Sequence, residues 1–435
     1  MADFIRYIII FGISAILAAI FVAYRKKEDE VFVKLSVIFI SVFYLIPLYM
    51  LTFCGGFFYG LKFVNVDSPG VIRASAAIAI FVLGYFLPDL VNVIRRKASS
   101  DSVAESPAYE VNRKSVFLIF FAGMVCFAFY RAFAPSSDDL YNVRKGLDEG
   151  NHLLFLISIV STTLMISAFF LCIAARWKAL ALVCITLIVI GYCLASPGRT
   201  TLSLTIILSL IFVFRLSPKV LVATLPLAIL LLFPIIINGK ELIYKVIVLG
   251  DFHSIFDLYR FESLDGDDVF SNLAHPLVSM IYADDLISVA GQRYFYDYIQ
   301  GFLFYFRVFG IDFGNSLTYF NTYAILGINE SIVPPGYVAF GHAQFPYIGI
   351  IVSGFFYRMT FRIFSRSALY KIAGGREMIF YGSFICANTF YIGDIRQLVI
   401  SFFLVVLIMH VVGRLAVRSP ARLGDPNGAI IANGG

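Results

Sequence analysis

Two residues in this sequence are of types that could act on a phosphate-bearing molecule. Arg199 lies in a short Ser-Pro-Gly-Arg-Thr turn between two apolar segments, and His342 lies where a long polar segment returns to apolar sequence. A guanidinium can hold a phosphate through paired hydrogen bonds, and the start of the following helix would add backbone N–H donors. An imidazole can act as a general base near neutral pH. The simpler alternatives are an arginine that snorkels at a membrane edge and a histidine that makes a structural hydrogen bond.

Polar and aromatic residues accompany His342, namely Tyr337, Gln344 and Tyr347. Aromatic faces and amide groups suit sugar rings, which present an apolar face and a rim of hydroxyl groups. Aromatic residues are also common at membrane interfaces, so the pattern by itself is not specific. The long polar segment before them carries arginines among many carboxylates, for which a solvated surface is the simpler explanation. These residues include Arg260, Arg293, Arg307, Asp284 and Glu330.

The composition requires these residues to be positioned by a membrane-embedded fold. Of the 435 residues, 60% are apolar and only 14% are charged, whereas an ordinary soluble domain has roughly 25% charged residues. The net charge of +6 is spread in small groups between apolar runs, which argues against a nucleic-acid partner. The six cysteines form no Cys-x-x-Cys pair, so neither a disulfide framework nor a metal site is expected.

About eleven segments approach the roughly 20 apolar residues that a helix needs to cross a bilayer. They cover residues 5–24, 31–53, 71–94, 115–133, 152–175, 179–195, 201–216, 220–238, 342–357, 377–393 and 397–413. Lys and Arg collect at alternate ends of successive segments, and short basic loops resist translocation. The sequence therefore predicts an all-α, multi-pass membrane protein with its N-terminus outside and its C-terminus inside.

The expected organisation has four parts. They are helices one to eight over 1–238, a large outward loop over 239–341, three further spans over 342–413 and an inner tail over 414–435. A connection of about a hundred residues is far longer than usual, and such loops commonly carry function. Within it, His275-Pro276 is expected to start an amphipathic helix, and the aromatic stretch 293–307 is expected to lie in the headgroup layer.

This layout resembles the Wzy-type O-antigen polymerases and, more broadly, the O-antigen ligases. The resemblance is carried by the Gly198-Arg199 turn and by the glycine-rich return from Pro334 to Arg358. It implies a GT-C-like fold and an inverting glycosyl transfer at the periplasmic face of a bacterial inner membrane. A growing glycan on undecaprenyl pyrophosphate would move onto a sugar hydroxyl of a new lipid-linked repeat unit. The implied partners are this lipid-linked oligosaccharide, membrane lipid and a chain-length regulator protein, and no cofactor is expected.

The resemblance also implies roles for individual residues. Arg199 would stabilise the charge that develops on the leaving diphosphate, and His342 would be the general base that takes the proton of the attacking hydroxyl. The further cations would be Arg260, Arg293 and Arg307, the substitute bases Glu330 and Asp284, and the sugar contacts Tyr337, Gln344 and Tyr347. The sequence departs from the ligases where Ala343 follows His342, since those enzymes have a His-Asn pair.

Three other classes of protein stay open as alternatives. An O-antigen ligase would share the site described above. A lipid-phosphate-sugar glycosyltransferase should have an acidic pair in an early outward loop, whereas Asp138-Asp139 follows the fourth span. A polysaccharide flippase or another transporter should have broken helices and charges at mid-membrane, whereas Lys34, Arg73 and Asp89 lie near span ends.

Overall fold

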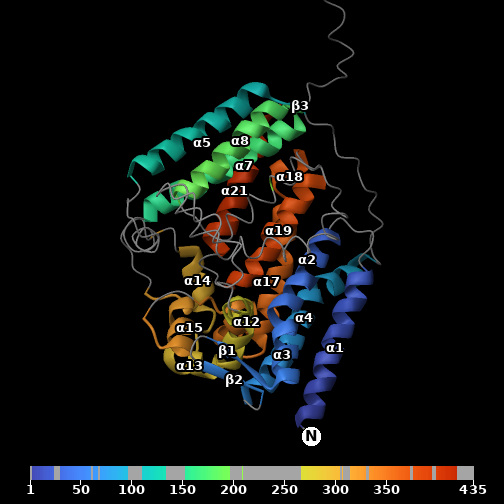
Figure 1. The fold of residues 1–435 in the computed structure, drawn as a ribbon. Helices are drawn as coiled ribbons and strands as arrows, with labels where there is room; N and C mark the ends of the chain where they lie inside the picture. Colours follow the sequence, from blue (N-terminus) through green and yellow to red (C-terminus); the bar gives the residue numbers. More distant parts are fainter. Residues whose placement is uncertain are drawn as a thin grey trace, which may run out of the picture.

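The structure is a computed structural model of the chain, and it is helical almost throughout the residues that it describes (Figure 1). Those residues are 2–23, 30–59, 62–66, 69–96, 110–133, 152–195, 208, 266–303, 306, 314–329, 333–372, 376–393 and 398–418. The predicted spans over 201–216 and 220–238 lie outside these ranges, apart from residue 208.

The first half of the chain forms long apolar helices. They are α1 (Ala2–Ala23), α2 (Glu30–Ile40) with the π-helical turn η1 (Ser41–Leu45) and α3 (Ile46–Cys54), α4 (Pro69–Arg96), α5 (Arg113–Phe133), α7 (His152–Ala174) and α8 (Lys178–Ala195). The continuous helix α2-η1-α3 ends at Gly55, whose positive φ of 80° suits a glycine C-cap. These boundaries lie within a few residues of the first six predicted segments, because each helix follows a long apolar run.

The second half begins with short helices and ends with longer ones. They are α12 (Gly266–Ile281), α13 (Ala283–Ala290), α14 (Tyr296–Leu303), α15 (Leu317–Leu326), α16 (Gly336–Gln344), α17 (Ile348–Ser365), α18 (Ala368–Ile372), α19 (Arg376–Ile392), the π-helical η4 (Val399–Phe403) and α21 (Leu404–Ala416). Across the described residues, five helices are long and apolar enough to cross a membrane. They cover Glu30–Cys54, Gly70–Asp89, Arg113–Phe133, Leu156–Ala174 and Ile348–Ser365, and the protein is therefore a mostly helical, membrane-embedded one.

Two expected helix boundaries in this half are wrong. The span expected over 342–357 is instead divided between α16 and α17. Pro346 explains the break, because proline lacks an N–H and disfavours helical backbone in the residue before it, and Phe345 is indeed extended. Pro276 does not start a helix but lies inside α12, which begins ten residues earlier.

Helices α4 and α17 form a close parallel pair at the centre of the fold. A Cβ atom at Gly84 would lie 2.4 Å from the carbonyl oxygen of Ile351, and one at Gly354 would lie 2.4 Å from that of Phe81. Glycine is required at both places because only a missing side chain lets the two backbones approach this closely. Further along the pair, Asp89 accepts hydrogen bonds from Arg358 at 3.0 and 3.2 Å and from Arg362 at 2.7 Å.

The fold also contains two short antiparallel strand pairs, which extend the expected all-α description. Strands β1 (Gly56–Tyr59) and β2 (Lys62–Asn65) form a hairpin beside α12, and β3 (Glu110–Val111) pairs with β4 (Val417–Arg418). In Figure 1 the hairpin lies with α12, α13 and α15 at one end of the molecule, and β3 lies with α18 at the other. The topology predicted from the sequence also puts the hairpin and the long loop on one side of the membrane, and β3 and α18 on the other. Which of the two sides is outside stays a prediction.

Candidate functional site

The first group of polar residues lies where α4, α13 and α16 meet. Arg73 on α4 donates through Nη1 to the carboxylate of Asp284 on α13, and through Nη2 to the carbonyl oxygen of Ile281 at 3.1 Å. His342 on α16 is 5% exposed and interacts electrostatically with both members of this ion pair. Within the described part of the chain, His342 Nδ1 and Arg73 Nε are both buried without a hydrogen-bond partner. The group therefore has unused polar atoms on a base and on a cation.

The surroundings of His342 favour its neutral form. Burial lowers the pKa of this imidazole from its usual value of 6.5, the nearby Arg73 guanidinium lowers the pKa further, and the Asp284 carboxylate raises it. The first two effects prevail, because an imidazolium loses water on burial and is repelled by a neighbouring cation. A neutral imidazole can accept a proton, which is the form that a general base needs.

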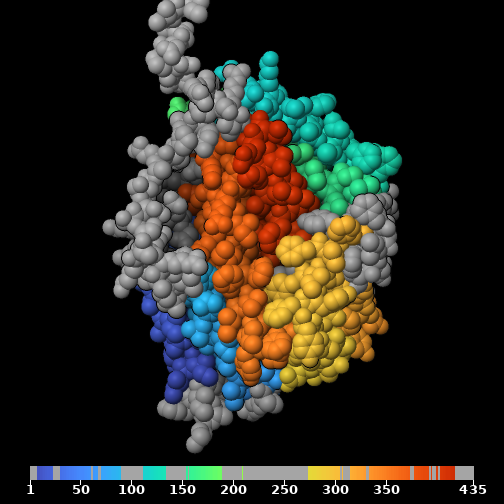
Figure 2. Space-filling view, turned by 180° about the vertical axis from the view of Figure 1, so that it is seen from behind, coloured from blue at the N-terminus to red at the C-terminus, as the bar shows by residue number. Residues whose placement is uncertain are grey.

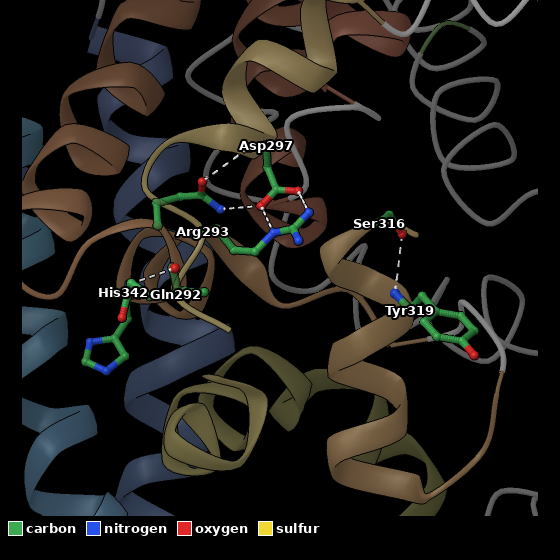
Figure 3. Close-up of polar contacts among 8 residues, drawn as sticks. Gln292, Arg293, Asp297, Ser316, Tyr319 and His342 are labelled. Atoms are coloured by element: carbon green, nitrogen blue, oxygen red, sulfur yellow. Dashed lines mark hydrogen bonds and ion pairs between the residues drawn. The ribbon is translucent and has the colours of Figure 1, made fainter. Parts of the chain in front are cut away.

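A second group joins the beginning of α14 to the end of α16. Arg293 donates to both carboxylate oxygens of Asp297, at 2.9 Å each, and Gln344 Nε2 donates to the same carboxylate at 2.7 Å (Figure 3). The side chains of Asp297 and Gln344 are buried, and the Arg293 guanidinium lies 5.0 Å from the ring centroid of Tyr296. A bidentate pair with a further donor fixes this arginine in place.

The two groups are linked through backbone but face different directions. Gln292 Nε2 donates to the carbonyl oxygens of His342 and Ala343 at 3.2 and 2.8 Å, and the Arg293 N–H donates to Ala343 at 3.0 Å. These bonds satisfy carbonyl groups that the end of a helix leaves open. Figure 3 shows the His342 ring directed away from the Arg293 and Asp297 pair. The turn before α14 therefore holds the main chain at the end of α16.

The other predicted site residues are distributed unevenly. Tyr337 is fully buried and packs with Phe81, Tyr357 and Phe390, so its surroundings are those of a core residue. Of the three predicted sugar contacts, only Tyr347 is exposed, at 55%, and its ring centroid lies 6.4 Å from that of His342. Four predicted residues lie outside the described residues: Arg199, Arg260, Arg307 and Glu330.

Sequence reasoning did not assign a role to Arg73, Gln292 or Asp297. The spacing of Arg293 and Asp297, four residues apart, is a signal that could have revealed their ion pair. No such signal links Arg73 to His342, since they are far apart in sequence. In the ranges that the structure covers, no three His, Cys, Asp or Glu side chains gather in a way that could hold a metal ion.

Comparisons of the chain with protein-family models, with curated proteins and with solved structures found no match.

Proposed function

We propose that this protein polymerises undecaprenyl-pyrophosphate-linked oligosaccharide repeat units at the periplasmic face of a bacterial inner membrane. The observation that carries the proposal is the position of His342, a buried base whose neutral form is favoured, beside the cation Arg73. Arg73 lies in the first turns of the apolar helix α4, and His342 lies on α16 beside it. A reaction between two lipid-linked sugars needs a site near the end of an apolar helix, because the lipid tails stay in the membrane while the sugars meet in water.

The proposed reaction is a single displacement. The hydroxyl oxygen of the incoming unit forms a bond to the anomeric carbon of the growing glycan, and its proton goes to His342. The bond from that carbon to the diphosphate oxygen breaks, and undecaprenyl pyrophosphate leaves with the electron pair. Cations must stabilise the charge that develops on the leaving group. Inversion at the anomeric carbon follows, without a covalent intermediate on the protein.

The arginines divide into two kinds in this proposal. Arg73 is paired with Asp284, whose side chain is 67% exposed, and keeps a buried Nε without a partner among the described residues. Water weakens such an exposed pair, so Arg73 is the arginine that we expect to exchange its partner for the diphosphate. Arg293 is already held by the buried carboxylate of Asp297, to which Gln344 also donates. The proposal retains Arg199 as a further diphosphate ligand on the sequence resemblance.

The test is chain elongation by the purified protein in liposomes. Lipid-linked repeat units isolated from cells that lack this protein serve as the substrate, and the products are separated by length on a gel. We expect the wild type to give a ladder, and His342→Gln to leave single units, because the hydroxyl keeps its proton. Arg199→Ala should have the same effect through loss of leaving-group stabilisation.

His410→Gln provides the matched control, since His410 lies on α21, away from the proposed site. This variant should give the wild-type ladder. A normal ladder from His342→Gln would remove the histidine from the mechanism. Transfer of a finished glycan to a different lipid acceptor without elongation, or movement of the lipid-linked unit across the bilayer without bond formation, would replace the proposal with a ligase or a transporter.

A further inference from the structure

Helix α14 has its polar residues inside and its apolar residues outside. Its buried positions include Asp297 and Gln300, each 1% exposed. Its outward positions are Tyr296, Ile299 and Phe302, which are 46%, 60% and 51% exposed. A surface helix in water has the opposite arrangement, because exposed apolar area and buried polar groups both cost free energy there. This arrangement is the one expected of a helix whose outer face meets an apolar environment.

The outer face of α14 continues into a second apolar surface. On η4 and α21, Phe403 is followed at four-residue intervals by Leu407, Val411 and Leu415, which are 60%, 48% and 61% exposed. Four-residue spacing places these side chains along one stripe of the helix. The ring centroid of Phe302 lies 5.8 Å from that of Phe403, at the end of the stripe. Figure 2 shows the surface of α21 in red next to that of residues 266–303 in yellow.

We propose that the outer face of α14 lies against the acyl chains of the bilayer, in continuity with the lipid-facing stripe of α21. The Arg293, Asp297 and Gln344 group then lies behind a lipid-facing helix rather than in open water. Interfacial helices insert their apolar face about 5–10 Å into the boundary between headgroups and acyl chains. At that depth Asp297 needs the donors that it has, because water cannot replace them. This inference concerns the membrane boundary and is independent of the proposed reaction.

The test uses the single tryptophan of the chain, Trp177. In a Trp177→Phe background, Ile299→Trp places a fluorophore on the outer face of α14 in the full-length protein. The protein is reconstituted in phosphatidylethanolamine and phosphatidylglycerol vesicles whose acyl chains carry bromine, and aqueous iodide is added separately. We expect brominated lipid to quench the fluorescence and iodide to have little effect. Shallow bromines should be more effective than deep ones, because an interfacial helix inserts its apolar face only about 5–10 Å.

Two further variants calibrate the measurement. Leu407→Trp on α21 should be quenched by brominated lipid as well, and Val289→Trp on α13, a site 40% exposed, should respond to iodide instead. If Ile299→Trp lowers the yield of folded protein, the more conservative Phe302→Trp gives the same readout. The proposal is overturned if the α14 probe is quenched by iodide and not by lipid. Protection from both quenchers would also overturn it, since another protein surface would then cover α14.

Discussion

Helices α13 and α14 have eight residues each and lie close together in the chain, yet their surfaces have opposite polarity. Helix α13 buries Ala283 and Leu286 and exposes Asp284, as a helix in water does. Helix α14 buries Asp297 and exposes Ile299. This difference is what we expect if residues 283–303 meet two solvents, water at α13 and, as proposed above, lipid at α14. The position of each helix relative to the membrane follows from which residues it hides.

The ion pairs of the two helices also differ in exposure to solvent. Asp284 on α13 pairs with Arg73, and its side chain is 67% exposed, whereas the Asp297 side chain on α14 is 2% exposed in its pair with Arg293. An exposed pair is weakened by water and salt. A buried pair is costly to break because the remaining charge has no solvent.

The largest expected effect comes from removing these two carboxylates in turn. Asp297→Ala should destabilise the protein by about 3–5 kcal/mol, because it leaves Arg293 as an uncompensated, largely buried charge. Asp284→Ala should cost only about 0.2–1 kcal/mol, since water compensates for the lost partner. Unfolding of the purified variants in detergent measures both changes. Equal losses of stability in the two variants would show that burial does not make the Asp297 pair more important than the Asp284 pair.

A lysine on the outer face of each helix should have the next largest effect. Ile299→Lys places a charge against lipid, for which insertion into a membrane costs up to about 3 kcal/mol. Val289→Lys places the same charge in water and should be nearly neutral. The amount of folded protein extracted from membranes, together with its unfolding midpoint, separates the two variants. A destabilising Val289→Lys would place α13 in the membrane too and would end the contrast.

The smallest effect concerns the pH dependence of the site that α13 adjoins. Because the pKa of His342 is lowered from 6.5, the unfolded chain binds a proton that the folded protein resists. Stability should therefore fall as the pH drops below about 6.5, and His342→Gln should remove this dependence. The same titration should set the acid limb of the elongation rate. A pH profile should show that limb moved upward by Arg73→Gln and downward by Asp284→Asn.

If Asp284→Asn shifts the acid limb upward, Asp284 does not act on His342 by its charge. If neither variant shifts it, a group other than His342 limits the rate at low pH.

Much of the helical framework could be predicted from the sequence, and the reasons are local. Helices α5 and α7 begin and end within about two residues of the predicted spans, because a long apolar run has few other ways to satisfy its backbone in lipid. The prediction was wrong at residues 342–357, where hydropathy continues but Pro346 breaks the helix. Mean hydropathy reports how apolar a segment is. A single proline changes that mean very little, so the break at Pro346 is not visible in it.

The candidate site was harder to predict because its contacts are long-range. His342 was singled out by its position at the end of the loop, but Arg73 and His342 are brought together only when α16 packs against α4. Asp297 is one of the many carboxylates of the long polar segment, for which the sequence favours a solvated surface. Its burial depends on Gln344, 47 residues away. The contact between Asp297 and Gln344 forms only when the helices pack, so it cannot be predicted from a single sequence.

The pairing of β3 with β4 has a practical consequence for orienting the protein. Glu110 lies opposite Arg418, so no membrane can pass between the start of α5 and the end of α21. An epitope tag beyond residue 418 and a protease site before residue 110 must be reached from the same compartment. An accessibility measurement on intact cells would then give the direction of α5, which begins beside this strand pair.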